Sequence, residues 1–188
     1  MHKPLSTGAT IGILGGGQLG RMLSVAAARL GFRSHIFEPN PDCPASHVAN
    51  RLTTASYTDT KALQRFAETV DVITYEFENI PTSALDVLEQ VATIRPGREA
   101  LRISQDRLTE KDFLNGLGLK TAPYASINDV SALRAALKAF GTAAILKTRR
   151  FGYDGKGQVR LQSDSDPEAA TANMAGQAAL LEGFVDFS

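Results

Sequence analysis

The sequence is poor in the residues that build disulfides and metal centres. Cys43 is its only cysteine, which excludes an intrachain disulfide or a cysteine-based metal cluster and is typical of a reducing compartment. The three histidines, His2, His35 and His47, lack a partner three or four positions away and predict no metal site. His35 lies inside an expected strand, so we interpret it as a core residue.

The sequence also lacks an excess of charge and a long apolar run. It has 20 basic and 20 acidic residues, so bulk attraction for nucleic acid or for an anionic membrane is absent. The first residues, MHKPLSTGATIGILGGG, are too polar for a signal peptide or a membrane span. No serine lies in a nucleophile elbow, and Cys43 has no evident base beside it. We expect a cytoplasmic protein without nucleic-acid or membrane partners and without a covalent nucleophile.

A glycine-rich turn opens the chain's first regular unit. Residues 10–14 form an apolar run that leads into GGGQLG, a helical pattern and a second strand ending at Glu38. This order predicts a βαβ unit, and Gly15, Gly17 and Gly20 have the spacing of a dinucleotide fingerprint. Two interpretations stay open here: a nicotinamide or flavin site, or the tight first turn that any doubly wound sheet needs.

Two acidic residues follow the clearest strand of the first half. Residues 70–75 read as that strand and lead directly to Glu76 and Glu78. Ligands of open α/β sheets gather at this end of strands, and residues two apart share one face if the strand continues. The pair could bind a metal, hold sugar hydroxyls or act as acid and base. The alternative is a solvated strand end.

The break Arg95-Pro96-Gly97 divides the expected domains into residues 1–97 and 98–188. After it come two helical stretches, and Asp106 is a candidate cap for the second. Arg107 and Lys111 are four positions apart on that helix, and spacing alone favours a solvated face. The remaining pattern of hairpin strands and two helices predicts a small α+β unit, distinct from the βαβ unit before it.

A second glycine-rich loop lies in AILKTRRFGYDGKGQV, residues 144–159. An apolar strand carries Lys147, and Gly152, Gly155 and Gly157 follow in the loop. Peptide N–H groups in such a loop can point at anionic oxygens, and the lysine adds a positive charge. The pattern predicts a phosphate-handling loop. An ordinary hairpin with solvated basic residues at its tip is the alternative.

Five segments, taken in order, resemble one family over the whole chain: GGGQLGRM, YEFENIP, SQDRLTEK, AILKTRRFGYDGKGQ and LLEGFV. The family is that of the carboxyaminoimidazole ribonucleotide synthetases, the ATPase subunits of phosphoribosylaminoimidazole carboxylase, in the ATP-grasp superfamily. The resemblance implies an α/β fold with a Rossmann-like pre-ATP-grasp domain, without a nicotinamide, followed by a small α+β ATP-grasp lid subdomain. A large C-terminal ATP-grasp domain completes the family's pattern.

The resemblance also implies an ATP-dependent carboxylation. Magnesium-bound ATP phosphorylates bicarbonate to carboxyphosphate, which delivers carbon dioxide to the amine of 5-aminoimidazole ribonucleotide. Arg107 and Lys147 would contact the phosphates, the glycine loop would close over them, and the edge of the strand at Glu182 would read adenine. The implied ATP-binding residues are Arg107, Lys147, Gly152, Tyr153, Asp154, Gly155, Lys156, Gly157, Gln158, Glu182, Gly183, Phe184 and Val185. The implied substrate-binding residues are Gln18, Leu19, Glu76, Tyr153 and Asp154.

The sequence stops at Ser188, just after the adenine-lining segment that the resemblance implies. The family's magnesium ligands and its basic residues for bicarbonate are therefore expected beyond it, and we assign no metal ligand or catalytic residue here. We expect the N-terminal half of a homodimeric ligase, inactive alone. The alternatives are an NAD(P)-binding oxidoreductase module, a non-catalytic nucleotide-binding regulator, or another ATP-grasp enzyme such as formate-dependent glycinamide ribonucleotide transformylase or biotin carboxylase.

Overall fold

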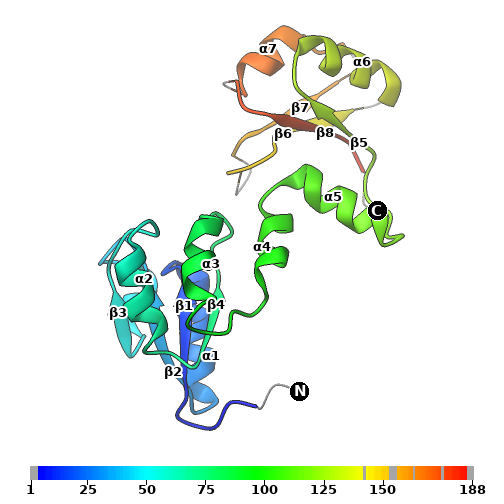
Figure 1. The fold of residues 1–188 in the computed structure, drawn as a ribbon. Coiled ribbons are helices and arrows are strands. Elements are labelled where there is room, and N and C mark those ends of the chain that lie inside the picture. Colours follow the sequence, from blue (N-terminus) through cyan, green and yellow to red (C-terminus); the bar gives the residue numbers. More distant parts are fainter. Residues whose placement is uncertain (1–3, 142, 153–155, 163, 175, 186–188) are drawn as a thin grey trace. The chain divides into compact units, whose positions relative to one another are not determined.

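The computed structural model describes residues 4–141, 143–152, 156–162, 164–174 and 176–185. The chain divides into two compact units, Met1–Arg102 and Ile103–Ser188, each with its own sheet (Figure 1). The boundary expected after residue 97 precedes helix α4 (Arg98–Ser104), whose Leu101 is fully buried in the core of the first unit. The α/β class with two different units, as expected from the sequence, is confirmed.

The first unit is a four-stranded parallel sheet in the order β3-β2-β1-β4. Its strands are β1 (Thr10–Leu14), β2 (Arg33–Phe37), β3 (Arg51–Thr53) and β4 (Val72–Tyr75). Parallel neighbours require crossover connections, and helices α1 (Gln18–Arg29) and α2 (Thr60–Ala67) provide them. Because β1 lies between β2 and β4, the carboxyl ends of all three strands meet at one edge of the sheet.

Both faces of this sheet are covered, as the alternation of side chains along a strand requires. On one face Leu14, Phe37 and Ile73 join the core formed with α2 and α3 (Thr82–Leu88). On the other face Ile13 and Ile36 pack with Cys43 and with the short 3-10 helix η1 (Pro44–His47). Asp59 caps α2 by accepting from the Ala62 N–H at 3.0 Å.

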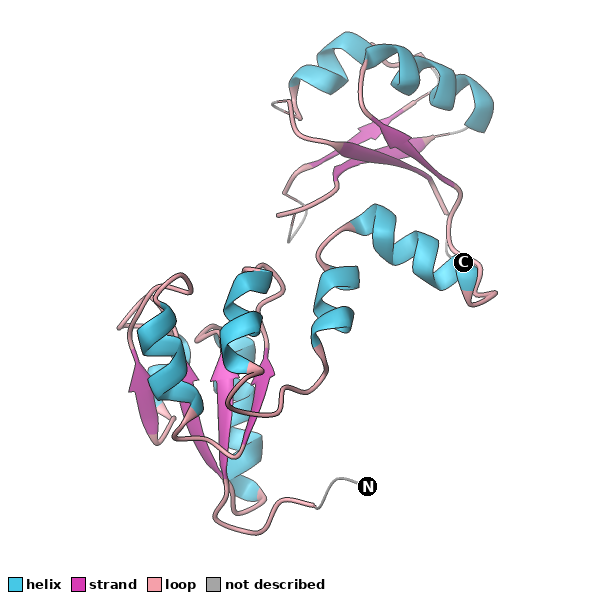
Figure 2. Ribbon diagram, in the orientation of Figure 1, coloured by secondary structure: helices cyan, strands magenta, loops and turns pink. Residues whose placement is uncertain are grey.

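The second unit is a four-stranded antiparallel sheet in the order β5-β8-β6-β7. The strands are β5 (Tyr124–Ile127), β6 (Ala144–Thr148), β7 (Gln158–Leu161) and β8 (Ala179–Gly183). Helices α6 (Val130–Phe140) and α7 (Pro167–Ala172) cover one face (Figure 2). Leu146 and Leu181 point into the core beneath them, so the alternating residues Lys147 and Glu182 face the opposite side.

Helix α5 (Arg107–Gly116) precedes the first strand of this sheet in the chain and is capped as expected. Asp106 accepts from the Leu108 N–H at 3.0 Å and from the Thr109 N–H at 3.3 Å. This cap fixes where the helix begins and therefore which residues lie on its first turn. Among the described helices, none is long and apolar enough to cross a membrane.

His35 is a core residue, as predicted, with 5% of its surface exposed. Its ring nitrogens lie 2.9 Å from Thr69 Oγ1 and 2.8 Å from Thr53 Oγ1, and its ring packs edge-on against Phe66. Burial, with a contribution from the charge of Arg51, lowers the pKa of His35 from 6.5 to about 4. Below neutral pH the unfolded chain therefore binds a proton at this residue before the folded chain does.

This difference predicts a loss of stability in acid. Between pH 6.5 and about 4 the free energy of unfolding of the first unit should fall by about 3 kcal/mol through His35. Urea denaturation of the wild-type chain and of His35→Gln at several pH values gives the free energy of unfolding as a function of pH. The effect is the difference between the slopes of these two plots against pH. The matched control, His47→Gln, replaces an exposed histidine and should keep the wild-type slope. Equal slopes for the wild type and His35→Gln would contradict the prediction.

Candidate functional site

The glycine turn after β1 is held by two carboxylates of its own unit. Gly16 donates its N–H to Glu38 Oε2 at 2.9 Å, and Gly17 donates to Glu76 Oε1 at 2.8 Å. Glu38 follows β2 and Glu76 follows β4, so the strand order brings both acids to the end of β1. Gly15 adopts φ +105°, a backbone conformation that favours glycine.

This geometry opposes the dinucleotide interpretation of the turn. A pyrophosphate at the N-terminus of α1 would need the peptide N–H groups that Glu38 and Glu76 occupy. It would also lie beside two carboxylates, whose charge repels it. Glu38, which the fingerprint spacing places near a ribose, binds the turn itself instead.

A cavity of about 430 Å³ opens beside this turn. Burial has the largest effect on the pKa of Glu76 and raises it. The hydrogen bond from the Gly17 N–H lowers this pKa, and the charge of Glu38 raises it further. Burial and the same two carboxylates also raise the pKa of Tyr57. The lining residues are Gly16, Gly17, Glu38, Pro39, Asn40, Cys43, Pro44, Tyr57, Glu76 and Phe77. The cavity therefore suits a ligand that offers several hydrogen-bond donors rather than an anion.

The other residues expected at this end of the sheet differ in their exposure and in their contacts. Gln18 and Leu19 begin α1 and are exposed, so their side chains are accessible to a ligand. Glu78 is exposed, while Glu76 turns to the glycine turn. The condition for these two acids to share a face is not met, because β4 ends at Tyr75, before either of them. No group of three His, Cys, Asp or Glu residues in the described part of the chain could hold a metal ion.

In the second unit, basic side chains anchor the segment that follows β6. Arg107 donates to the carbonyl oxygens of Thr148 at 2.9 Å and Gly152 at 2.8 Å. Arg149 forms two hydrogen bonds to Asp106, at 2.7 and 3.0 Å, and Arg150 donates to Gln105 Oε1. Burial opposes ionisation of Asp106, but Arg149 and the helix amides outweigh it and hold the pKa of that carboxyl below its usual value.

These contacts correct part of one interpretation of the second glycine loop, while the phosphate-handling interpretation stays a prediction. β6 and β7 do form an antiparallel hairpin, with Lys147 opposite Gln158. The interpretation of its basic residues as merely solvated is wrong for Arg149, whose side chain is 25% exposed, and for Lys147, at 22%. Lys156 and Gln158 are exposed, and Gly157 adopts φ +69°. Tyr153, Asp154 and Gly155 lie outside the described residues.

Three charged side chains meet on the face of the sheet opposite α6 and α7. Lys147 Nζ lies 2.7 Å from Glu182 Oε2, and Lys111 Nζ lies 3.3 Å from Glu182 Oε1. The side chain of Glu182 is only 12% exposed. Burial opposes its ionisation, but Lys147 and then Lys111 outweigh this and hold the pKa of Glu182 below its usual value. We call Lys111, Lys147 and Glu182 the lysine–glutamate cluster.

Lys111 is the residue that sequence reasoning missed. The solvated face expected for Arg107 and Lys111 is wrong, since the Lys111 side chain is 14% exposed and paired with Glu182. The available signal was their spacing: residues four apart share a helix face, and Arg107 was already implied in the site. Spacing could not reveal that this face meets β8.

The segment expected to line adenine continues from β8. Phe184 and Val185 are 39% and 41% exposed, and the Arg160 guanidinium lies 4.4 Å from the Phe184 ring centroid. The expected free strand edge is wrong, because β8 lies between β5 and β6. The N–H groups of Gly183 and Phe184 already donate to Pro123 and Ala143.

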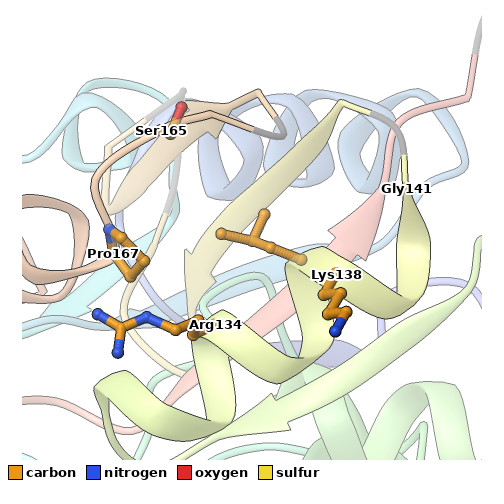
Figure 3. A pocket seen from close by; sticks show the side chains of 6 residues that line it. Arg134, Lys138, Gly141, Ser165 and Pro167 are labelled. Atoms are coloured by element: carbon orange, nitrogen blue, oxygen red, sulfur yellow. The ribbon is translucent and has the colours of Figure 1, made fainter.

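A separate hollow lies between α6 and the start of α7 (Figure 3). Arg134 and Lys138 project from α6 on one side of it, and Ser165 and Pro167 line the other. Arg134 is paired with Glu168, and no residue implied by the sequence lines this hollow. We therefore assign it no role in the candidate site.

The glycine turn yields a packing prediction. A Cβ added at Gly16 would overlap Cys43 Sγ and approach Glu38 Cγ to 2.8 Å, so Gly16→Ala should lower the free energy of unfolding by about 1–3 kcal/mol. Gly97→Ala is the matched control, since nothing lies within 4 Å of its added Cβ. The double variant Gly16→Ala/Cys43→Ala should recover part of the loss. Urea denaturation measures all three, and equal stability of Gly16→Ala and Gly97→Ala would contradict this packing.

Comparisons with known proteins cover both units. Residues 8–105 match the ribonucleotide synthetase preATP-grasp domain, and residues 112–188 match the ATP-grasp domain. The N5-carboxyaminoimidazole ribonucleotide synthase of Brucella melitensis is 56% identical over 97% of this chain and 51% of its own length. The bifunctional purine synthesis protein purC/E of Dictyostelium discoideum is 44% identical over 97% of this chain and 19% of its own.

Solved structures agree with these matches. The ADP complex of an N5-carboxyaminoimidazole ribonucleotide synthetase superposes with a TM-score of 0.91 at 41% identity, covering 100% of this chain and 50% of that one. The Aspergillus clavatus enzyme in complex with ADP and 5-aminoimidazole ribonucleotide gives 0.84 at 27% identity, over 97% and 48%. The chain thus spans about half the length of such enzymes. With both units matched, it belongs to the ATP-grasp family of N5-carboxyaminoimidazole ribonucleotide synthases.

Proposed function

We propose that the chain serves the ATP-dependent carboxylation of 5-aminoimidazole ribonucleotide by bicarbonate, which gives N5-carboxyaminoimidazole ribonucleotide, ADP and phosphate. The observation that carries the proposal is the lysine–glutamate cluster beside the anchored loop after β6. Relatives with the same fold bind ADP, and one binds ADP together with the aminoimidazole ribonucleotide.

The second unit is the proposed nucleotide site. The cluster has two ammonium groups and one carboxylate, which leaves one net positive charge for a phosphate. Arg107 holds the carbonyls of Thr148 and Gly152, so we propose that it positions the loop as well as contacting the nucleotide. The remaining proposed ATP-binding residues are Lys147, Tyr153, Asp154, Gly155, Lys156, Gly157, Gln158, Glu182, Gly183, Phe184 and Val185.

The cavity of the first unit is the proposed site for the aminoimidazole ribonucleotide. Glu76 and Glu38 offer acceptors to the hydroxyl and amine donors of such a ligand, and Gln18 and Leu19 follow the glycine turn directly. Tyr153 and Asp154 of the glycine loop complete the proposed set. The two units thus receive ligands of different chemistry: a polyanion on the cationic cluster and a donor-rich heterocycle on the paired carboxylates.

The proposed chemistry proceeds in two steps. A bicarbonate oxygen attacks the γ-phosphorus of ATP, ADP leaves, and the product is carboxyphosphate. Carboxyphosphate then loses phosphate, and the substrate amine forms a bond to the released carbon dioxide while a base takes the amine proton. The chain's contribution is to position the reactants and neutralise phosphate charge. The described residues include no group of three His, Cys, Asp or Glu side chains that could hold a metal ion, so no step is assigned to magnesium.

The expected setting of the protein also remains a proposal. We propose a cytoplasmic homodimer, and the free, buried Cys43 is consistent with a reducing compartment. The runner-up function, an NAD(P)-binding module, loses support because carboxylates occupy the N–H groups of the first turn.

Nucleotide binding tests the proposed site. Lys147→Met should weaken ADP binding by at least about tenfold, because it removes the ammonium that we propose contacts the phosphates. Lys138→Met, on the outer helix α6, should bind as the wild type does. Isothermal titration of the chain with ADP and with NADH provides the measurement. Binding of NADH without ADP would favour an oxidoreductase and contradict the proposal.

Turnover tests the reaction and the need for further residues. The 188-residue chain alone should not release ADP in response to bicarbonate and aminoimidazole ribonucleotide, because its relatives are about twice as long. A longer polypeptide that contains this chain should release ADP only when both are present. Turnover by the 188 residues alone would refute the first expectation. Dependence on formate and glycinamide ribonucleotide would instead identify the other ATP-grasp reaction.

A further inference from the structure

We propose that Lys111 is a positioning residue that keeps Glu182 paired when Lys147 turns from this carboxylate to the phosphates of a bound nucleotide. The inference rests on the proposed nucleotide site. It extends that site to a residue on α5 to which the family resemblance assigns no role.

The strand pairing explains why Glu182 needs a permanent partner. Glu182 lies opposite Tyr124 on β5 and Ile145 on β6, in the middle of the sheet, with a side chain only 12% exposed. A carboxylate at this burial is strongly disfavoured without a cation, because water cannot replace the lost partner. If Lys147 were its only counter-ion, binding of a phosphate by Lys147 would leave Glu182 unpaired.

The two lysines use different oxygens of the carboxylate, so one can leave without displacing the other. Lys147 contacts Oε2 at 2.7 Å, and Lys111 contacts Oε1 at 3.3 Å. Of the two contacts, that of Lys147 is the shorter. When Lys147 moves to a phosphate, Lys111 keeps the charge of Glu182 compensated.

Lys111 is held in place by its own helix and by β5. It lies one helical turn after Arg107, which is fixed to the carbonyls of Thr148 and Gly152. Its Nζ lies 5.6 Å from the centroid of the Tyr124 ring, and the Tyr124 hydroxyl donates to Asp112 Oδ1 at 2.7 Å. These contacts restrict the ammonium of Lys111 to the vicinity of Glu182 and distinguish it from a mobile surface lysine.

A double-mutant cycle on the chain tests whether Lys111 acts through Glu182. Lys111→Met should weaken ADP binding by about tenfold, and in a Glu182→Gln background the same change should cost less than about twofold. Lys111→Arg should restore most of the affinity because it keeps the charge. Lys120→Met, which removes an exposed lysine of the same unit, should have no effect. An equal loss in both backgrounds, or no loss, would overturn the proposal.

A measurement without nucleotide keeps the proposal separate from the proposed function. In Lys111→Met the ammonium of Lys147 becomes the only partner of Glu182 within the cluster. Acylation of Lys147 by an amine reagent should therefore slow by about twofold or more. Mass spectrometry measures this rate, with Lys120 as the internal reference. Unchanged labelling of Lys147, with normal ADP binding by the wild type, would overturn this proposal alone. Absence of ADP binding to the wild type would overturn the proposed function.

Discussion

The structure of the first unit depends on the need of buried peptide N–H groups for acceptors. At the turn after β1, Glu38 and Glu76 accept from Gly16 and Gly17 and thereby join the ends of three strands. The close contact of Gly16 with Cys43 leaves no room for a side chain. The same glycine spacing that would bind a pyrophosphate in another protein here forms an acidic cavity, because the acceptors come from within the chain.

The second unit has the opposite electrostatic character. Its open sheet face gathers Lys111 and Lys147 around the single carboxylate of Glu182, and Arg107 ties the following loop to α5. Cations that outnumber the acids beside them attract a polyanion, whereas paired carboxylates attract hydrogen-bond donors. This contrast gives a physical reason for placing the nucleotide on the second unit and the aminoimidazole ribonucleotide on the first.

Local sequence patterns predicted much of the fold. They could not predict contacts between residues that lie far apart in the sequence. The cap at Asp106 and the buried His35 follow from neighbours in the sequence. The pairing of Lys111 with Glu182 and the central place of β8 depend on strand order, which no local pattern determines. Glu76 and Glu78 do not continue a strand together, because β4 ends at Tyr75. The ends of strands are poorly defined by sequence.

The central claim is that the second glycine loop, and not the first, belongs to the nucleotide site. Backbone amide chemical shifts of the chain, recorded as ADP is added, test it directly. The account predicts shifts at Lys147, Thr148 and the segment from Glu182, with Gly16 and Gly17 unchanged because their N–H groups already donate to carboxylates. Shifts at Gly16 and Gly17 without any in the second unit would contradict it.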